Sequence, residues 1–243
     1  MALKITIHMK YFILLFFCCF LGLNQSVDAQ ILDSLKNLNK SKVDKKVDRS
    51  AYYHVGFMLN EPDYNGPEIR LGNSWRWGVG NQTAFLLGDG NRFALGWGTN
   101  FAWDHYRLEQ NDLKSFPDST LHDKEQFISQ NIYFDLFPRF YFDDKPNNKA
   151  RSYIDLGLYG EWSHTMKHKT INEYDPANGV GGGKTEVVQR KLDYVNRWHY
   201  GAVARLNFGI LGIFGVYRFN DLFKEDSNLT DLPKLMVGLQ ITR

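Results

Sequence analysis

The feature that most constrains the fold is an alternation of large apolar residues with small or polar ones. Between Phe93 and Trp103 every odd position holds Phe, Leu, Trp or Thr, while every even position holds Ala, Gly or Asn. Strict alternation over this length predicts a strand with two different faces and not a helix. Seven further segments alternate in the same way, so the chain is predicted to be all-β. The eight predicted strands are Tyr53–Leu59, Trp75–Leu87, Phe93–Trp103, Ile132–Phe142, Ile154–Trp162, Trp198–Phe208, Leu211–Phe219 and Leu235–Ile241.

The connections between these segments alternate in length. Gly88-Asp89-Gly90-Asn91 is a compact turn sequence, the segment from Asp143 to Arg151 is short, and another turn falls near Gly209. The longer connections are Glu109–Ile128, Thr165–Val195 and Asn220–Pro233, and only Asn60–Gly66 is a short exception. Short turns on one side and long loops on the other predict an eight-stranded antiparallel up-and-down transmembrane β-barrel.

The residues on the two faces decide which face looks outward. The central parts of the apolar faces carry no Asp, Glu, Lys or Arg, and all six Trp lie on them. Six inward Trp side chains would crowd an eight-stranded interior, which side chains already fill. The apolar face is therefore predicted to face lipid, with an aromatic girdle toward the long-loop ends. The predicted girdle consists of Trp75, Trp77, Trp103, Trp162 and Trp198.

The opposite face carries the charged residues and is predicted to line the barrel interior. Buried charges persist when they are paired, so we expect a closed ion-pair network and not a pore. The predicted network consists of Arg76, Asp104, Asp135, Arg139, Asp155, Glu161, Arg197, Arg205 and Arg218. A narrow channel or transporter lined by the same residues is the alternative. With the faces reversed, the chain would be a secreted, lipocalin-like barrel that binds a ligand.

The first residues have the three-part layout of a secretory signal peptide. Lys4 and Lys10 precede an apolar run from Tyr11 to Leu23, and small residues stand before a predicted cleavage site after Ala29. The run is short for a membrane-spanning helix, which needs about 20 apolar residues. We therefore predict a signal peptide over residues 1–29, a flexible, basic periplasmic lead-in over 30–50 and the barrel domain over 51–243.

Cysteine usage and net charge narrow the function further. Cys18 and Cys19 lie in the signal peptide, and neither follows the small residue that lipidation would need. The mature chain is then free of cysteine, which excludes disulfides, thiolate metal sites and cysteine nucleophiles. The net charge of +2 gives no indication of nucleic-acid binding.

Three further patterns are weighed as possible sites of chemistry. The glycine-rich run Gly179–Thr185 lacks the spacing and the strand–loop–helix context of a phosphate-binding loop. His164 and His168 share one face of a strand, but no third ligand accompanies them. A hydrolytic enzyme could use a serine nucleophile, a histidine base and an aspartate, and these residue types occur at Ser74, His54, His199 and Asp104. Their spacing in the sequence does not bring them together. We therefore predict no catalytic, cofactor-binding or metal-binding residues, and no cofactor.

Several short motifs resemble the PorT-like outer-membrane β-barrel family. The motifs are Asn73–Gly78, Phe101–Arg107, Asn196–Gly201, Asp221–Lys224 and Leu235–Leu239. The resemblance implies an eight-stranded barrel of Gram-negative bacteria, in a family with some members tied to type IX protein secretion or gliding, and it implies no catalytic residues. The chain departs from such barrels at its end, Ile241-Thr242-Arg243, which lacks the common terminal aromatic residue.

These observations together predict a non-enzymatic outer-membrane protein that is a structural or assembly component, linked to protein secretion or gliding. We expect contact with outer-membrane lipid, and with protein partners through the long loops or the N-terminal lead-in. Both termini are expected in the periplasm. An outer-membrane enzyme that modifies lipid is a further alternative to the channel and the secreted barrel.

Overall fold

The structure is a computed structural model that describes residues 47–60, 67–88, 92–111, 114, 120–142, 151–174, 183–227 and 229–243. The predicted signal peptide and residues 30–46 of the predicted lead-in lie outside the described residues. No helix in the described ranges is long and apolar enough to cross a bilayer.

The described residues form nine β-strands and a short 3₁₀ helix. In chain order these are β1 (Val47–Leu59), β2 (Trp75–Leu87), β3 (Phe93–Leu108), β4 (Lys124–Tyr141), β5 (Tyr153–Tyr174), β6 (Gly183–Arg190), β7 (Trp198–Phe208), β8 (Leu211–Arg218), η2 (Glu225–Ser227) and β9 (Leu235–Thr242). The strands follow the predicted alternation, because buried and exposed residues alternate along them, as in the β3 pattern.

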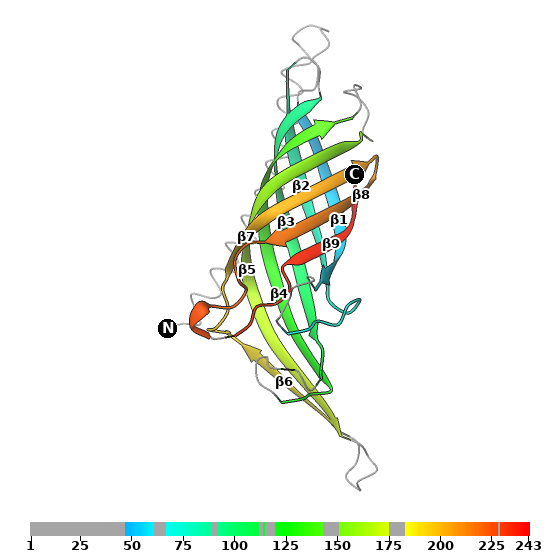
Figure 1. Cartoon of the computed structure of the whole chain (residues 1–243). Coiled ribbons are helices and arrows are strands. Elements are labelled where there is room, and N and C mark those ends of the chain that lie inside the picture. Colours follow the sequence, from blue (N-terminus) through cyan, green and yellow to red (C-terminus); the bar gives the residue numbers. More distant parts are fainter. Residues whose placement is uncertain are drawn as a thin grey trace, which may run out of the picture. The chain divides into compact units, whose positions relative to one another are not determined.

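Eight of the strands close into a barrel (Figure 1). Each strand pairs antiparallel with its neighbours in the circular order β1, β2, β3, β4, β5, β7, β8 and β9, and β9 pairs back with β1. Closure satisfies the backbone hydrogen bonds on both sides of each strand, so the wall has no open edge along these pairings. The predicted eight-stranded antiparallel barrel is confirmed.

The strands extend further along the chain than the sequence predicted. β4 begins at Lys124, inside the predicted loop Glu109–Ile128, and β5 continues to Tyr174. β6 pairs with the far part of β5, from Lys167 to Tyr174, and forms a hairpin that continues the wall (Figure 1). The prediction of a long loop from Thr165 to Val195 is therefore wrong in part. Strand β6 is exposed throughout, so no apolar face marked it in the sequence.

The barrel also begins earlier than predicted, because β1 starts at Val47 and not at residue 51. Asp48 provides the reason. Its Oδ2 accepts a hydrogen bond of 2.6 Å from the Tyr141 hydroxyl and lies 3.5 Å from Nη1 of Arg139. These contacts hold the last residues of the predicted lead-in on the barrel wall.

The outer surface of the barrel carries an uncharged, largely apolar belt. Leu136 on β4, Leu158 on β5 and Leu239 on β9 are 57%, 63% and 67% exposed. Along β3 the outward residues run from Phe93 to Trp103, ten steps that span about 33 Å along a strand. At the strand tilt usual for barrels, this gives a height of about 25 Å, which matches the apolar band of outer-membrane barrels.

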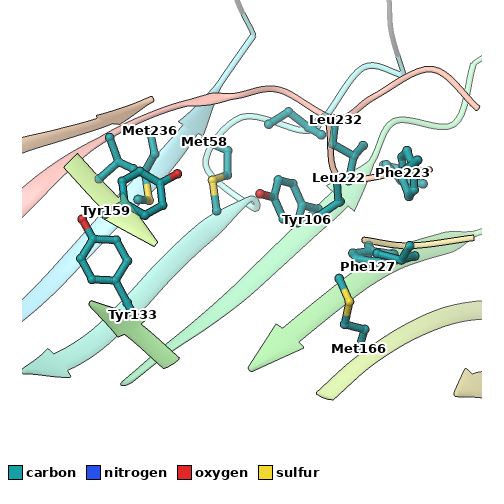
Figure 2. Packing of buried hydrophobic residues seen from close by; sticks show 14 of the residues in the cluster. Met58, Tyr106, Phe127, Tyr133, Tyr159, Met166, Leu222, Phe223, Leu232 and Met236 are labelled. Atoms are coloured by element: carbon teal, nitrogen blue, oxygen red, sulfur yellow. The ribbon is translucent and has the colours of Figure 1, made fainter. Parts of the chain in front are cut away.

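A capping segment between β8 and β9, described over residues 219–227 and 229–234, folds over the long-loop end of the barrel interior. Its Leu222, Phe223 and Leu232 are buried among apolar side chains from the barrel wall (Figure 2). The ring of Phe223 meets that of Phe127 on β4 edge to face, with centroids 6.0 Å apart. Tyr106 belongs to the same buried cluster. This end of the interior is therefore filled by apolar packing.

Candidate functional site in the barrel interior

The turn-side cluster is a set of ion pairs near the short turns, formed by Asp48, Asp135, Arg139, Asp155 and Arg205. Arg139 on β4 binds Asp155 on β5 with two hydrogen bonds, Nε to Oδ1 at 2.7 Å and Nη2 to Oδ2 at 2.9 Å. Its Nη2 also donates to Oε1 of Gln82 at 2.7 Å. The guanidinium stacks over the Tyr153 ring at 3.6 Å. This two-bond geometry is the strong arrangement for an arginine and a carboxylate.

Arg205 on β7 joins Asp135 to the same cluster. Its Nη2 donates to Oδ2 of Asp135, and its Nη1 lies 3.9 Å from Oδ2 of Asp155. The Asp135 carboxylate lies against Gly98 of β3, where an added Cβ would overlap Oδ1 of Asp135. Glycine at this position therefore makes room for the buried carboxylate.

The loop-side cluster lies further along the interior and consists of Arg76, Asp104 and Glu161. Arg76 on β2 donates through Nε and Nη2 to the two carboxylate oxygens of Asp104 on β3, the second bond being 2.6 Å long. Its Nη2 also lies 2.8 Å from Oε2 of Glu161 on β5. Asn131 on β4 donates to Asp104 at 2.7 Å. Side chains that meet across the interior from β2, β3, β4 and β5 thus supply each charge with a partner.

The structure places eight of the nine predicted network residues inside the barrel, all of them buried. Arg218, the eighth, does not join either cluster but anchors the capping segment, donating to Oδ2 of Asp231 at 2.8 Å and to the Leu232 carbonyl at 2.9 Å. Arg197 is the exception and its predicted position is wrong. It is exposed because β7 begins one residue later, at Trp198, so Arg197 precedes the wall.

Sequence reasoning missed two carboxylates of these ion pairs, Asp48 and Asp231. The first fell in the predicted lead-in and the second in a predicted loop. One indication was present, because the predicted network held five arginines against four acids and therefore needed another acid. Alternation alone gives no means of choosing it.

The space left between the clusters is small. A cavity beside Arg76, Asp104 and Glu161 has a volume of about 30 Å³, and a neighbouring one beside Asn100 and Arg205 has about 20 Å³. These volumes count the space open to the centre of a water-sized sphere. A single buried water needs at least about 10–15 Å³ of such space, so each cavity has room for one or two waters. Neither cavity is large enough for a solute.

The five predicted girdle tryptophans lie on outward positions. Trp75 and Trp198 are the first residues of β2 and β7 on the long-loop side, whereas β3 and β5 continue beyond Trp103 and Trp162. Trp77 and Trp103 face each other across β2 and β3 and stack with ring centroids 4.0 Å apart. Trp162 and Trp198 pair across β5 and β7, with centroids 6.2 Å apart. Trp75 stacks on His105 at 5.3 Å. These contacts gather the tryptophans into two groups, one on β2 and β3 and one on β5 and β7, and the girdle itself stays a prediction.

The two histidines weighed as metal ligands lie on opposite faces of the sheet. Pairing between β4 and β5 shifts by one residue near Gln130, so a β-bulge at His164 and Thr165 reverses the alternation from Thr165 on. His164 then packs beside Trp162 on the outside, with ring centroids 5.4 Å apart, whereas His168 is buried. The described residues contain no group of three or more His, Cys, Asp or Glu that could hold a metal ion.

His168 instead belongs to a buried polar cluster beyond the girdle. Its Nε2 lies 2.8 Å from Oε1 of Glu125, and Nζ of Lys114 lies 2.8 Å from Oε2 of the same carboxylate. Gln110 donates to Oε2 at 2.9 Å. Burial raises the pKa of the Glu125 carboxyl, but the hydrogen bonds from His168, Lys114 and Gln110 together hold it below its usual value. No spacing in the sequence predicts this cluster, which joins three separate segments.

We expect the contact between Gln110 and β4 to weaken as the pH falls below 4.5. Because the pKa of Glu125 is lowered by folding, its ionised form favours the folded contact; this contribution is present above the usual pKa of 4.5 and is lost as the pH falls through the lowered pKa. The amide of His122 donates to Oε1 of Gln110 at 2.8 Å and reports on the contact. Its hydrogen exchange, corrected for the intrinsic rate, should accelerate at acid pH. Glu125→Gln should show fast exchange already at pH 7, and unchanged protection in that variant would contradict the expectation.

The residues weighed as enzyme candidates do not form a catalytic arrangement. Asp104 is occupied by Arg76, and His54 packs edge to face against Phe214, with ring centroids 5.1 Å apart. Oγ of Ser74 accepts the Arg107 amide hydrogen at 2.9 Å. His199 is buried, and across the described strands no hydrogen bond joins any two of these four candidates. Of the glycine-rich run, Gly183-Lys184-Thr185 lies in β6 and the preceding four residues lie outside the described ranges.

Comparison with known proteins gives a structural likeness but no family assignment. No protein-family model matches the chain, and no curated protein matches it, so the resemblance to PorT-like barrels stays a prediction. Among solved structures, the chain is similar to Ail, the attachment invasion locus protein of Yersinia pestis, determined in complex with the heparin analogue sucrose octasulfate. The match has 12% identity and a TM-score of 0.27, and covers 81% of this chain and 97% of Ail.

Proposed function

We propose that this protein is an integral outer-membrane β-barrel with a closed interior, which acts as a structural or assembly component and not as an enzyme. The observation that carries the proposal is that the barrel wall has an apolar outer face and a charged, filled inner face. The outside carries an uncharged belt about 25 Å high with tryptophans on its long-loop side, and the inside is filled by ion pairs and packed side chains. A lipid bilayer is the environment that suits the uncharged outer belt, because apolar side chains are more stable in contact with lipid than with water.

The interior also argues against a secreted, ligand-binding barrel. Such a barrel presents its apolar face to a central pocket, whereas the apolar residues of this barrel, such as Leu158, point outward and Arg139 and Asp155 point inward. A hydrophobic ligand would have to displace buried ion pairs, and leaving a charge without its partner is costly.

The two interior cavities have room only for water molecules. We therefore expect the protein to act through its outer surfaces. In the proposed orientation the short turns and both termini face the periplasm, and the β5–β6 hairpin and the capping segment face outward. The resemblance to PorT-like barrels names protein secretion and gliding as the processes to examine. Partners would bind at the outward elements or at the N-terminal lead-in, and nucleic acid is not among them.

Gel mobility of the outer-membrane fraction tests the location and the fold together. Membrane barrels that resist SDS until heated migrate as compact species when unboiled, so we expect a band in that fraction whose mobility shifts on boiling. Recovery of the protein in the soluble periplasmic or extracellular fraction, without a shift, would overturn the proposal in favour of the secreted barrel.

Planar-bilayer recording tests whether the interior is closed. Because the interior cavities hold only one or two waters each, we expect no discrete conductance steps from the inserted protein. A steady conductance whose ion selectivity changes in Arg139→Gln or Arg205→Gln would instead support the narrow channel.

A further inference from the structure

A row of basic side chains lies on the outside of the barrel, directly beyond the tryptophan girdle. In the sheet register His105 of β3 faces Ile128 of β4, which faces Lys167 of β5, which faces Arg190 of β6. Trp103 stands two residues before His105 on the same face, a distance of about 7 Å along the strand. On β3 the row therefore begins one step beyond the tryptophan girdle, where a bilayer surface would meet the polar headgroups.

The next row of the same face adds Arg107 on β3 and Lys169 on β5, with Gln126 of β4 between them. We call Arg107, Lys167, Lys169 and Arg190 the basic row. Lys169 is paired with Glu186 at 2.7 Å. In the described part of the chain no carboxylate forms an ion pair with Arg107, Lys167 or Arg190, and Arg107 reaches only the Asp123 carbonyl, at 3.3 Å. Arg107, Lys167 and Arg190 thus lack an anionic partner among the described residues.

The pairing of Lys167 with Arg190 is itself unfavourable without an anion. Directly opposite residues of antiparallel strands have Cβ atoms about 4.5–5.5 Å apart, and like charges in such a pair destabilise the sheet. An anion bound between the two side chains would replace this repulsion with attraction. The observation is independent of the height of the row and points to a negatively charged ligand.

We propose that the basic row binds the phosphate groups of a glycolipid in the outer leaflet of the membrane. Arginine and lysine are the side chains that bind phosphate, arginine by paired hydrogen bonds and lysine as a point charge. The apolar belt below the row accepts acyl chains, and the tryptophans lie at the level of the headgroups. A phosphorylated glycolipid offers its charges and its chains in this same order. The inference rests on the proposed membrane location and adds the class of lipid that the basic row would bind.

The test compares diphosphoryl lipid A with its phosphate-free form as probes. Full-length protein extracted from membranes in a non-ionic detergent is titrated with each lipid, and bound lipid is counted by native mass spectrometry. We expect the triple variant Arg107→Gln, Lys167→Gln and Arg190→Gln to bind diphosphoryl lipid A about tenfold more weakly than the natural protein, equal to about 1.4 kcal/mol. The phosphate-free lipid should bind both proteins equally, and as weakly as the variant binds diphosphoryl lipid A.

A matched variant controls for the loss of three charges. Lys184→Gln, Lys224→Gln and Arg243→Gln remove the same charge at exposed positions away from the basic row, and this protein should bind diphosphoryl lipid A as the natural one does. Equal binding by the basic-row variant and the natural protein, or no preference of the natural protein for the phosphorylated lipid, would overturn the inference. The boiling-dependent gel shift is measured on every variant. Its presence without phosphate selectivity overturns this inference alone, whereas its absence in the natural protein removes the membrane location as well.

Discussion

Replacing Leu158 with arginine is expected to lower the free energy of unfolding by about 2–4 kcal/mol, the cost of a cation on the lipid face near the bilayer midplane. Leu158 lies midway along the membrane-height part of β5, opposite Leu136 of β4, and its side chain is 63% exposed. In an aqueous environment so exposed a position would accept arginine without loss. The measurement is urea unfolding of the protein folded into phospholipid vesicles.

Val187→Arg provides the matched control for this prediction. Val187 is 50% exposed and also lies on a strand, but β6 is beyond the tryptophan girdle and outside the predicted bilayer. Its replacement should change the free energy of unfolding by no more than about 0.5 kcal/mol, as is usual at a surface position. Equal and small effects of the two substitutions would show that the belt faces water, and would contradict the proposed membrane location.

The part of the fold that the sequence predicts well is the part where the two faces differ chemically. From Phe93 to Trp103 each residue belongs to an apolar outer face or to an inner face of small and polar residues, so the period of two is visible. Closure into eight strands then followed from the count and from the alternating loop lengths. The interior position of Arg139 follows from the same alternation.

The sequence does not predict strands in which both faces meet water. Beyond the girdle, β6 is exposed along its whole length, and its residues alternate without an apolar side. Period-two patterns report burial of one face and not strand structure itself, and for this reason the sequence predicts a loop where the β5–β6 hairpin lies.

Side-chain positions near irregularities are equally hard to predict. A bulge at His164 and Thr165 leaves His164 outside and turns His168 inside, although their even spacing predicts one face. Arg197 lies outside the interior because β7 begins at Trp198. Both errors come from assuming that alternation continues across a point where the backbone departs from regular pairing, and no residue type marks either point.

Asp155→Ala is expected to produce the largest loss of stability of any single change considered, about 3–5 kcal/mol, because it leaves a buried arginine without its main partner. Arg139 loses both hydrogen bonds of its paired contact, and Arg205 loses its second carboxylate. Asp155 and Arg139 are almost completely buried, so water cannot replace the lost partner. Urea unfolding in vesicles measures the loss, and the boiling-dependent gel shift shows whether the variant still folds.

The double variant Asp155→Leu with Arg139→Met separates the cost of an unpaired charge from the cost of lost packing. Removing both charges leaves no uncompensated ion at this contact, and Arg205 keeps Asp135 as its partner. We therefore expect the double variant to be more stable than Asp155→Leu alone. A cycle completed with the single variants Asp155→Leu and Arg139→Met should give a coupling energy of about 0.5–3 kcal/mol between the two positions. Additive losses would instead mean that the two side chains contribute independently. The interior charges would then not stabilise the barrel as a network, and their presence inside a closed wall would require a different explanation, such as the passage of ions.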